Sequence, residues 1–295
     1  MNGRPRRQPG APAGRASRGR ADARTLDADE YRDFCRFLED ACGIVLGDNK
    51  QYLVASRLSR LMDESGIASL GELVRRLRSG AGPLRERTIE AMTTNETSWF
   101  RDNHPFRALR EKILPELARA QRNPVRIWSA ACSTGQEPYS ISMTVHDLQQ
   151  SRPGLLPGPV QIVATDISTE VLKVARQGRY DGLSMARGLG GDRRERFFRP
   201  VGDEWEVRPE IRARVQFRPL NLLQSYALLG RFDVIFCRNV LIYFSTDSKR
   251  DILERMARTL NPGGYLLLGG SESITGLSDA FALERYAGGV VYRLR

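Results

Sequence analysis

Apolar residues recur every three or four positions over residues 26–92, a spacing that predicts short amphipathic helices. Breaks near Gly43 and Gly66, and further breaks before Leu70 and Leu84, divide this stretch into four helices. The apolar positions of the first two helices are Tyr31, Phe34, Phe37, Leu38, Ala41, Val45, Tyr52, Leu53, Leu58 and Leu61. We therefore predict an all-α domain over residues 25–95.

From Val125 onward the pattern changes to apolar runs of strand length that alternate with helical segments. After the run that opens at Val125, the further strand-like runs are 161–166, 231–237, 265–268, 281–286 and 289–294. The last two are separated by a short turn, which predicts an antiparallel hairpin. Parallel strands with crossover helices and a terminal hairpin predict an α/β fold over residues 96–295. Its sheet is expected to be Rossmann-like and mostly parallel, with an antiparallel edge hairpin.

Residues 178–217 interrupt this alternation. Within them, the segments 196–199 and 204–207 flank a Gly-Asp turn, and 215–217 is a third short run that can pair with them. We predict that these segments form a small antiparallel β-subdomain inserted into the α/β domain.

The first strand passes through small residues around Gly135 into a helix, which leaves unpaired backbone N–H groups at one end of the sheet. The three-glycine phosphate fingerprint and a Walker lysine are both missing, so a pyrophosphate is poorly served. Asp166, at the tip of the second strand, lies where such folds hold a pair of ribose hydroxyls. These features favour a nucleoside without phosphates, and S-adenosylmethionine is the common ligand of that kind.

Charge and composition add three expectations. Seven arginines and one aspartate fall within residues 1–24, which lack Leu, Ile, Val and Phe, so we predict a disordered arm. A solubilising leader is favoured over an arm for anionic surfaces. The four cysteines and two histidines have no metal-ligand spacing, so no metal site is predicted. No apolar run approaches the ~20 residues of a membrane span, so we expect a cytoplasmic protein.

Five motifs occur in order along the chain. They are Asn95-Glu-Thr-Ser-Trp-Phe-Arg101, Ser133-Thr-Gly-Gln-Glu-Pro-Tyr-Ser140, Ala164-Thr-Asp166, Asn221-Leu222 and Phe236-Cys-Arg-Asn-Val-Leu-Ile-Tyr-Phe244. Together they resemble the CheR chemotaxis-receptor methyltransferases, and the resemblance covers residues 26–295. Two positions depart from the family's pattern: Trp99 stands where a phenylalanine is usual, and Gln136 where a second acid is common.

The resemblance implies a class I methyltransferase domain with an inserted β-subdomain, preceded by a helical domain. It implies that a methyl group passes from S-adenosylmethionine to glutamate side chains on the cytoplasmic helices of chemoreceptors, leaving S-adenosylhomocysteine. By motif position, the residues that resemble cofactor contacts are Asn95, Thr97, Arg101, Glu137, Asp166, Asn221, Leu222, Asn239 and Val240. Arg101 and Tyr243 resemble the residues beside the transferring methyl.

The implied reaction joins a carboxylate to a sulfonium and removes both charges, so a dry pocket favours it. A glutamate, with a pKa of about 4.3, is already ionised at neutral pH and needs no general base. We expect Arg101 to orient the cofactor carboxylate or the incoming glutamate, and Tyr243 to hold one oxygen. Asn221 is expected to read the adenine edge, and Glu137 to meet the cofactor's ammonium group or a ribose hydroxyl.

Two alternatives remain open from the sequence. A class I methyltransferase acting on nucleic acid is suggested by the pI of 9.9, although +6 of the net charge of +11 lies in residues 1–24. A non-catalytic S-adenosylmethionine-binding module would be expected to lack Arg101 or Tyr243, and both are present. We expect receptor helices as partners, no specific nucleic acid, and membrane association only through the receptor. The short hairpin around Gly202 favours binding that does not depend on a receptor tail.

Overall fold

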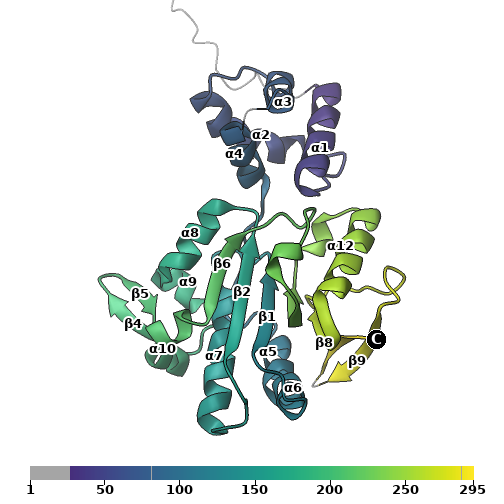
Figure 1. Ribbon diagram of the computed structural model, residues 1–295. Helices are drawn as coiled ribbons and strands as arrows, with labels where there is room; N and C mark the ends of the chain where they lie inside the picture. The colour runs from purple at the N-terminus through teal and green to yellow at the C-terminus, as the bar shows by residue number, and fades with distance from the viewer. Residues whose placement is uncertain (1–26, 81, 287) are drawn as a thin grey trace, which may run out of the picture.

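The computed structural model describes residues 27–80, 82–286 and 288–295, and the predicted arm of residues 1–24 lies outside this part of the chain. A small helical domain sits at one end of a larger α/β domain (Figure 1). Among the described residues, no helix combines the length and the apolar character that crossing a membrane requires.

The helical domain has four helices around a core of its own. They are α1 (Ala28–Cys42), α2 (Gln51–Glu64), α3 (Leu70–Arg78) and α4 (Gly82–Met92). Local signals set their ends. The Asp27 carboxylate accepts from two N–H groups of the first turn of α1, and the Ser69 hydroxyl accepts from Glu72 N in α3. Gly43, with φ of 79°, ends α1 in the left-handed conformation.

Two of the apolar positions assigned to these helices are exposed. Val45 is 44% exposed and Tyr52 is 67% exposed. Val45 lies beyond Gly43, so it cannot continue the helical face, and its N–H donates instead to Tyr243 O at 2.8 Å. In α2 the buried stripe runs through Val54, Leu58 and Leu61, and Tyr52 lies two positions before it, on the opposite side of the helix.

The α/β domain is built on a seven-stranded sheet with the order β6-β2-β1-β7-β8-β10-β9. The strands are β1 (Val125–Ala130), β2 (Val160–Asp166), β6 (Val215–Pro219), β7 (Phe232–Cys237), β8 (Leu260–Leu267), β9 (Phe281–Tyr286) and β10 (Gly289–Leu294). The pairs among β6, β2, β1, β7 and β8 are all parallel, and β10 pairs antiparallel with both β8 and β9. The predicted mostly parallel sheet with an antiparallel hairpin at its edge is therefore confirmed.

Helices cover both faces of this sheet. They are α5 (His104–Ala108), a π-helical turn (Leu109–Ile113), α6 (Leu114–Arg119), α7 (Gln136–Ser151), α8 (Thr169–Gln177) and α12 (Thr246–Thr259). Side chains alternate across β1: Val125 and Ile127 pack with α5, α6 and α7, whereas Trp128 and Ala130 pack with α12. The two layers bury β7 completely, whereas Arg231, the first residue of the predicted run 231–237, is exposed and lies outside the strand.

A second, three-stranded sheet with the order β3-β5-β4 lies beside the main one (Figure 1). Its strands are β3 (Arg179–Tyr180), β4 (Phe198–Val201) and β5 (Glu204–Val207), and the helices α9 (Gly182–Ala186), α10 (Gly191–Phe197) and α11 (Pro209–Arg212) accompany them. The hairpin of β4 and β5 turns at the predicted Gly-Asp pair and is antiparallel, as expected.

Three details of the predicted strands are wrong. Residues 215–217 do not belong to the small sheet, because β6 pairs in parallel with β2 in the main sheet, so the insert does not extend to residue 217. Val215 and Phe217 pack against Leu172 there, and a three-residue alternation does not specify which sheet it joins. Arg196 and Phe197 end α10 instead of opening β4. Strand β8 begins at Leu260, earlier than the predicted residue 265.

Contacts near the C-terminal end of α1 hold the helical domain against the α/β domain. Asn221 Nδ2 donates to Ala41 O at 2.8 Å, and Val45 N donates to Tyr243 O at 2.8 Å. At Gly43, an added Cβ would lie 2.3 Å from the Phe244 ring, so only glycine permits this approach. These contacts place the end of α1 over the carboxyl ends of β6 and β7.

Candidate active site

One pocket opens where the helical domain meets the carboxyl ends of β1, β2, β6 and β7, with the connecting segment 92–98 as a further wall. It holds about 1010 Å³ of space, part of it open to solvent. All ten residues singled out from the sequence line it: Asn95, Thr97, Arg101, Glu137, Asp166, Asn221, Leu222, Asn239, Val240 and Tyr243. Residues up to 148 positions apart in the sequence thus share one concave site, at the edge of the sheet where α/β folds bind ligands.

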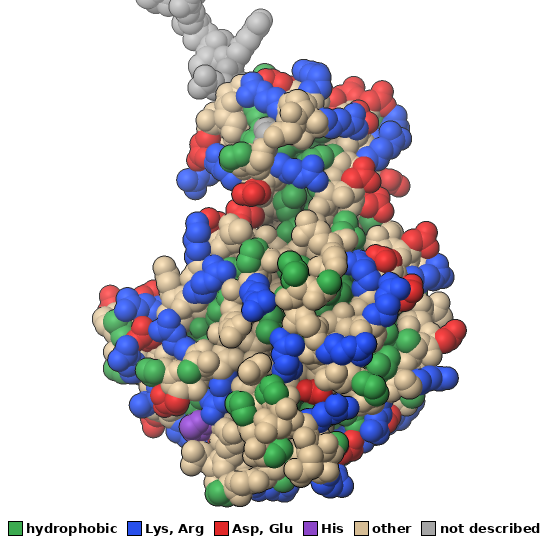
Figure 2. Space-filling model, viewed as in Figure 1, with side chains coloured by type: hydrophobic (Ala, Val, Ile, Leu, Met, Phe, Trp, Pro, Cys, Tyr) green, Lys and Arg blue, Asp and Glu red, His purple; other side chains and the backbone are tan. Residues whose placement is uncertain are grey.

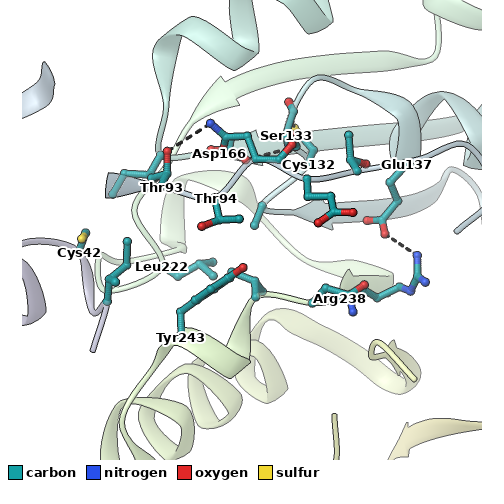
Figure 3. A pocket seen from close by; sticks show the side chains of 18 of the residues that line it. Cys42, Thr93, Thr94, Cys132, Ser133, Glu137, Asp166, Leu222, Arg238 and Tyr243 are labelled. Carbon is teal, nitrogen blue, oxygen red and sulfur yellow. Dashed lines mark hydrogen bonds and ion pairs between the residues drawn. The ribbon is translucent and has the colours of Figure 1, made fainter. Parts of the chain in front are cut away.

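Asp166, at the end of β2, is buried and fixed by backbone donors (Figure 3). Ser133 N donates to its Oδ2 at 2.8 Å, and Ser168 N donates to its Oδ1 at 3.0 Å. Burial raises the pKa of this carboxyl above its usual value, and the backbone N–H donors oppose that shift. Each oxygen keeps a further lone pair, so the carboxylate can still accept two hydroxyl donors from the pocket.

The turn between β1 and α7 depends on a glycine. Gly135 has φ of 97°, and an added Cβ would lie 3.0 Å from both Ala175 Cβ and Tyr180 Oη. The small residue expected at this strand-to-helix turn is therefore required by both backbone conformation and space. It places Glu137 in the first turn of α7, facing the pocket.

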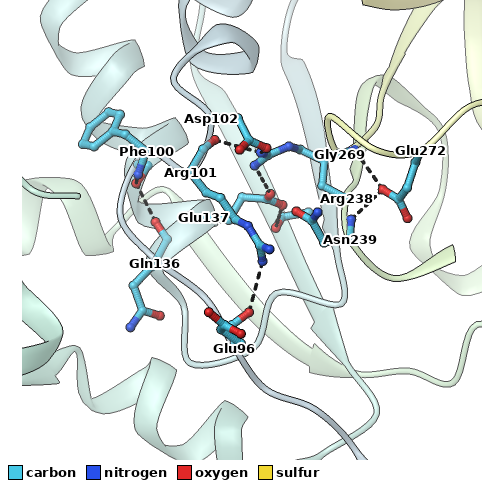
Figure 4. A network of polar contacts seen from close by, with 12 residues as sticks. Glu96, Phe100, Arg101, Asp102, Gln136, Glu137, Arg238, Asn239, Gly269 and Glu272 are labelled. Atoms are coloured by element: carbon cyan, nitrogen blue, oxygen red, sulfur yellow. Dashed lines mark hydrogen bonds and ion pairs between the residues drawn. The ribbon is translucent and has the colours of Figure 1, made fainter. Parts of the chain in front are cut away.

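Glu137 belongs to a polar network that the sequence did not reveal (Figure 4). Ser129 Oγ donates to Glu137 Oε1 at 2.8 Å, and Arg238 Nη1 donates to Glu137 Oε2 at 2.9 Å. Burial raises the pKa of the Glu137 carboxyl, and the Arg238 charge opposes that shift. The carboxylate predicted to meet a ligand ammonium group thus already has two protein partners.

Arg238 itself is a pocket residue that sequence reasoning missed. Its side chain is 1% exposed, and Nη2 donates to Arg101 O at 2.8 Å and to Asp102 Oδ2 at 2.7 Å. It therefore ties the segment that carries Arg101 to the first turn of α7. The sequence held one signal for it: within the motif Phe236–Phe244, this charged residue directly follows the apolar end of β7.

The turn after β7 is organised by Glu272, which was also missed. Its carboxylate accepts from the backbone N–H groups of Asn239 (2.6 Å), Val240 (3.1 Å) and Leu241 (2.9 Å). Asn239 has φ of 56°, a left-handed conformation that asparagine tolerates better than most residues. Nothing in the sequence marks Glu272, because its partners in the turn after β7 lie about thirty positions away and it contacts only backbone N–H groups, that of nearby Gly269 included.

Asn221 has a structural task in addition to the predicted one. Its Nδ2 donates to Ala41 O, and its Oδ1 accepts from Leu223 N at 3.0 Å. One N–H and one lone pair of the amide remain for a ligand. Adenine recognition by Asn221 therefore remains a prediction, and its side chain also holds the two domains together.

The two predicted catalytic side chains make few hydrogen bonds to other described residues. Arg101 Nη1 donates to Glu96 O at 3.3 Å, and no other side-chain hydrogen bond of Arg101 is found among the described residues (Figure 4). Tyr243, in a 3₁₀ turn (Leu241–Tyr243), directs its ring into the pocket (Figure 3). Both groups thus have donors available for a substrate.

Trp99 shows how the segment before Arg101 is anchored. It is buried, its Nε1 donates to Ser184 O at 3.1 Å, and its backbone N–H donates to Arg187 O at 2.9 Å. The indole therefore links the active-site segment to the inserted β-subdomain through a hydrogen bond that the usual phenylalanine could not make.

Two buried polar atoms of pocket residues lack a partner among the described residues: Arg238 Nε, a donor, and Asn239 Oδ1, an acceptor. Buried polar groups are normally paired, so these two atoms are candidates for contact with a ligand. A donor and an acceptor close to one another suit the carboxylate and ammonium groups of a free amino-acid end, and Asp166 suits a ribose diol. The residues present thus fit S-adenosylmethionine. The described residues hold no cluster of His, Cys, Asp or Glu placed to bind a metal ion.

Comparison with known proteins agrees with this geometry. The family model "CheR methyltransferase, SAM binding domain" matches residues 95–288, and "CheR methyltransferase, all-alpha domain" matches residues 29–93. The chain is 56% identical over 273 residues to chemotaxis protein methyltransferase 1 of Vibrio cholerae, covering 92% of this chain and 98% of that protein. It is 54% identical over 268 residues to chemotaxis protein methyltransferase 1 of Pseudomonas aeruginosa, covering 90% and 98%. This chain therefore belongs to the CheR methyltransferase family, and its cofactor is S-adenosylmethionine.

Proposed function

We propose that this methyltransferase esterifies glutamate carboxylates on the cytoplasmic helices of methyl-accepting chemotaxis receptors, and that it works in the cytoplasm. The products are glutamyl methyl esters and S-adenosylhomocysteine. Its relatives are named chemotaxis protein methyltransferases. The identity of the acceptor group rests on the chemistry of the pocket.

The observation that carries the proposal is that, among the described residues, the pocket presents positioning groups but no histidine and no unpaired carboxylate. Neither of the two histidines, His104 and His146, lines it. Its carboxylates are those of Glu96, Glu137 and Asp166, which pair with Arg187, with Arg238 and with backbone N–H groups, respectively. An amine acceptor would need to lose a proton, whereas a glutamate is ionised at neutral pH. The pocket therefore suits a carboxylate acceptor.

We assign some pocket residues to binding the cofactor and others to orienting the acceptor carboxylate. When bound, S-adenosylmethionine supplies an electrophilic methyl group on a sulfonium. We assign the ribose hydroxyls to Asp166, the amino-acid end to Asn239 and Arg238, and contact with the adenine ring to Leu222, which is 6% exposed. Arg101 and Tyr243 have donors free to align the incoming carboxylate, and alignment is a large part of catalysis for such a transfer.

Asp166→Asn should weaken binding of S-adenosylhomocysteine about tenfold or more, because hydrogen bonds to a charged acceptor contribute roughly 1.5–3 kcal/mol. Calorimetry with purified protein measures this directly. Asp247→Asn is the control, because the Asp247 side chain is 94% exposed and lies at the start of α12, outside the pocket. An affinity within twofold of the control would remove Asp166 from the ribose site.

The acceptor itself is tested by the chemistry of the product. After incubation with methyl-labelled cofactor and receptor cytosolic fragments, label on the receptor should become volatile in mild alkali, because esters hydrolyse and release methanol. N-methyl and C-methyl groups stay attached. Label that is stable to alkali would overturn the ester proposal.

Label that travels with RNA or DNA would instead favour the nucleic-acid alternative. On the face shown in Figure 2, Lys and Arg side chains are scattered over both domains with Asp and Glu among them, and they form no continuous band. That distribution is unlike the basic track that binds a nucleic-acid backbone.

A further inference from the structure

Glu90, in the last turn of α4, reaches across the domain boundary to the start of α8. Its Oε1 accepts from Thr169 N at 2.8 Å, from Glu170 N at 3.1 Å and from Thr169 Oγ1 at 3.1 Å. Ser168 Oγ donates to the same oxygen at 3.3 Å. A single carboxylate oxygen from the helical domain therefore satisfies the exposed donors at one helix end of the α/β domain.

This contact adds to the local cap that Ser168 provides at the start of α8. The first N–H groups of a helix have no partner within it, and a negative charge there is favourable. The Ser168 hydroxyl accepts from Val171 N only, so the N–H groups of Thr169 and Glu170 depend on Glu90. Removing that oxygen leaves two backbone donors of α8 without a protein partner among the described residues.

The same turn holds the ribose-binding carboxylate. Ser168, which contacts Glu90 through its hydroxyl, donates its N–H to Asp166 Oδ1 at 3.0 Å. Asp166 and Ile167 line the pocket, whereas Thr169 and Glu170 do not. The N-terminal end of α8 is thus connected to the cofactor site through Ser168.

On the other side of Glu90, α4 runs directly into the pocket wall. Met92, Thr93 and Thr94 line the pocket, and Arg57 in α2 fixes this wall from within the helical domain. Arg57 Nη1 donates to Met92 O at 2.6 Å, and Nη2 donates to Thr94 Oγ1 at 3.0 Å. Glu90 therefore joins two walls of the cofactor pocket from outside it.

We propose that Glu90 is a positioning residue for the cofactor, holding the Asp166 turn and the 92–94 wall in one arrangement so that cofactor affinity depends on docking of the helical domain. The side chain does not line the pocket, so it acts through Ser168 and Asp166. The inference goes beyond the proposed acceptor, because it concerns cofactor binding alone.

The test compares Glu90→Ala, Glu90→Gln and Glu86→Ala in the full chain by calorimetry with S-adenosylhomocysteine. Glu86 is exposed one turn earlier on α4 and serves as the matched control. Glu90→Ala should raise the Kd about tenfold, the effect of one lost charge-assisted hydrogen bond. Glu90→Gln keeps an acceptor oxygen and should stay within about threefold of wild type. Glu86→Ala should be unchanged.

A further readout separates positioning from general destabilisation. With saturating cofactor, the kcat of Glu90→Ala should be close to that of the wild type, while the KM for S-adenosylmethionine rises with the Kd. In the wild type, S-adenosylhomocysteine should also slow hydrogen exchange at the amides of Thr169 and Glu170, a measurement that needs no variant.

Three results would overturn the inference. They are a Kd for Glu90→Ala equal to that of Glu86→Ala, an equal loss of affinity in Glu90→Gln, and unchanged exchange at Thr169 and Glu170 on adding the ligand. Calorimetry and hydrogen exchange use no methyl acceptor, so failure here is distinguishable from failure of the proposed glutamate substrate.

Discussion

Arg238→Met is expected to lower the free energy of unfolding by about 3–5 kcal/mol, the cost of removing one partner from a buried ion pair. The Arg238 side chain is 1% exposed and contacts two carboxylates, Glu137 and Asp102, as well as Arg101 O. Methionine has a similar length and fills the space, but it leaves the 13%-exposed Glu137 carboxylate without its counter-charge. Urea unfolding measures the loss.

The loss should also depend on pH. Burial already raises the pKa of the Glu137 carboxyl, and the Arg238 charge lowers it, so removing Arg238 raises the pKa further. A carboxyl whose pKa is higher in the folded than in the unfolded state binds more protons when folded, so stability falls as pH rises. The penalty for Arg238→Met should therefore be larger at pH 8 than at pH 5.5.

A surface arginine provides the comparison. Arg250 forms an ion pair with Asp247 at 2.9 Å, with side chains 52% and 94% exposed, and such pairs contribute about 0–1 kcal/mol. Arg250→Met should therefore change stability little at either pH. Equal effects of the two substitutions would show that Arg238 is not the anchor of the network.

The strands around the pocket and the residues at their carboxyl ends could be predicted because the signals for both are local in the sequence. An apolar run followed by Gly135 or Asp166 gives both the strand and the side chain at its tip, and parallel strands bring those tips to one edge. Motif matches then added residues such as Asn95 and Tyr243 that no periodicity marks. All ten of these positions line the pocket.

What could not be predicted depends on contacts between distant segments. Glu272 and Glu90 act on backbone N–H groups about thirty and eighty positions away, and any exposed glutamate has the same local sequence signal. The β6 strand was assigned to the wrong sheet for a related reason. Its alternation fits either partner, and burial of Phe217 against Tyr139 and the α8 layer decides between them.

Residues of the helical domain line the pocket that we propose as the cofactor site. The domain's end at Cys42 lines the pocket, its connection to residue 98 forms a wall, and Asn221 reaches back to Ala41. A methyl transfer that removes charge is favoured where water is excluded, and walls from two domains reduce the exposure of the pocket to solvent.

Arg101→Ala should reduce turnover on receptor fragments about a hundredfold, because we propose that its guanidinium aligns the acceptor carboxylate, and a small misalignment of reacting groups costs that much. The melting temperature should change by less than about 2 °C, since the one side-chain hydrogen bond of Arg101 to the described residues is a 3.3 Å contact with Glu96 O. Single-turnover kinetics with saturating cofactor measure the chemical step. Arg110→Ala is the control, because Arg110 is exposed and lies outside the pocket. A single-turnover rate for Arg101→Ala equal to that of the control would assign the alignment to Tyr243 or to another pocket residue.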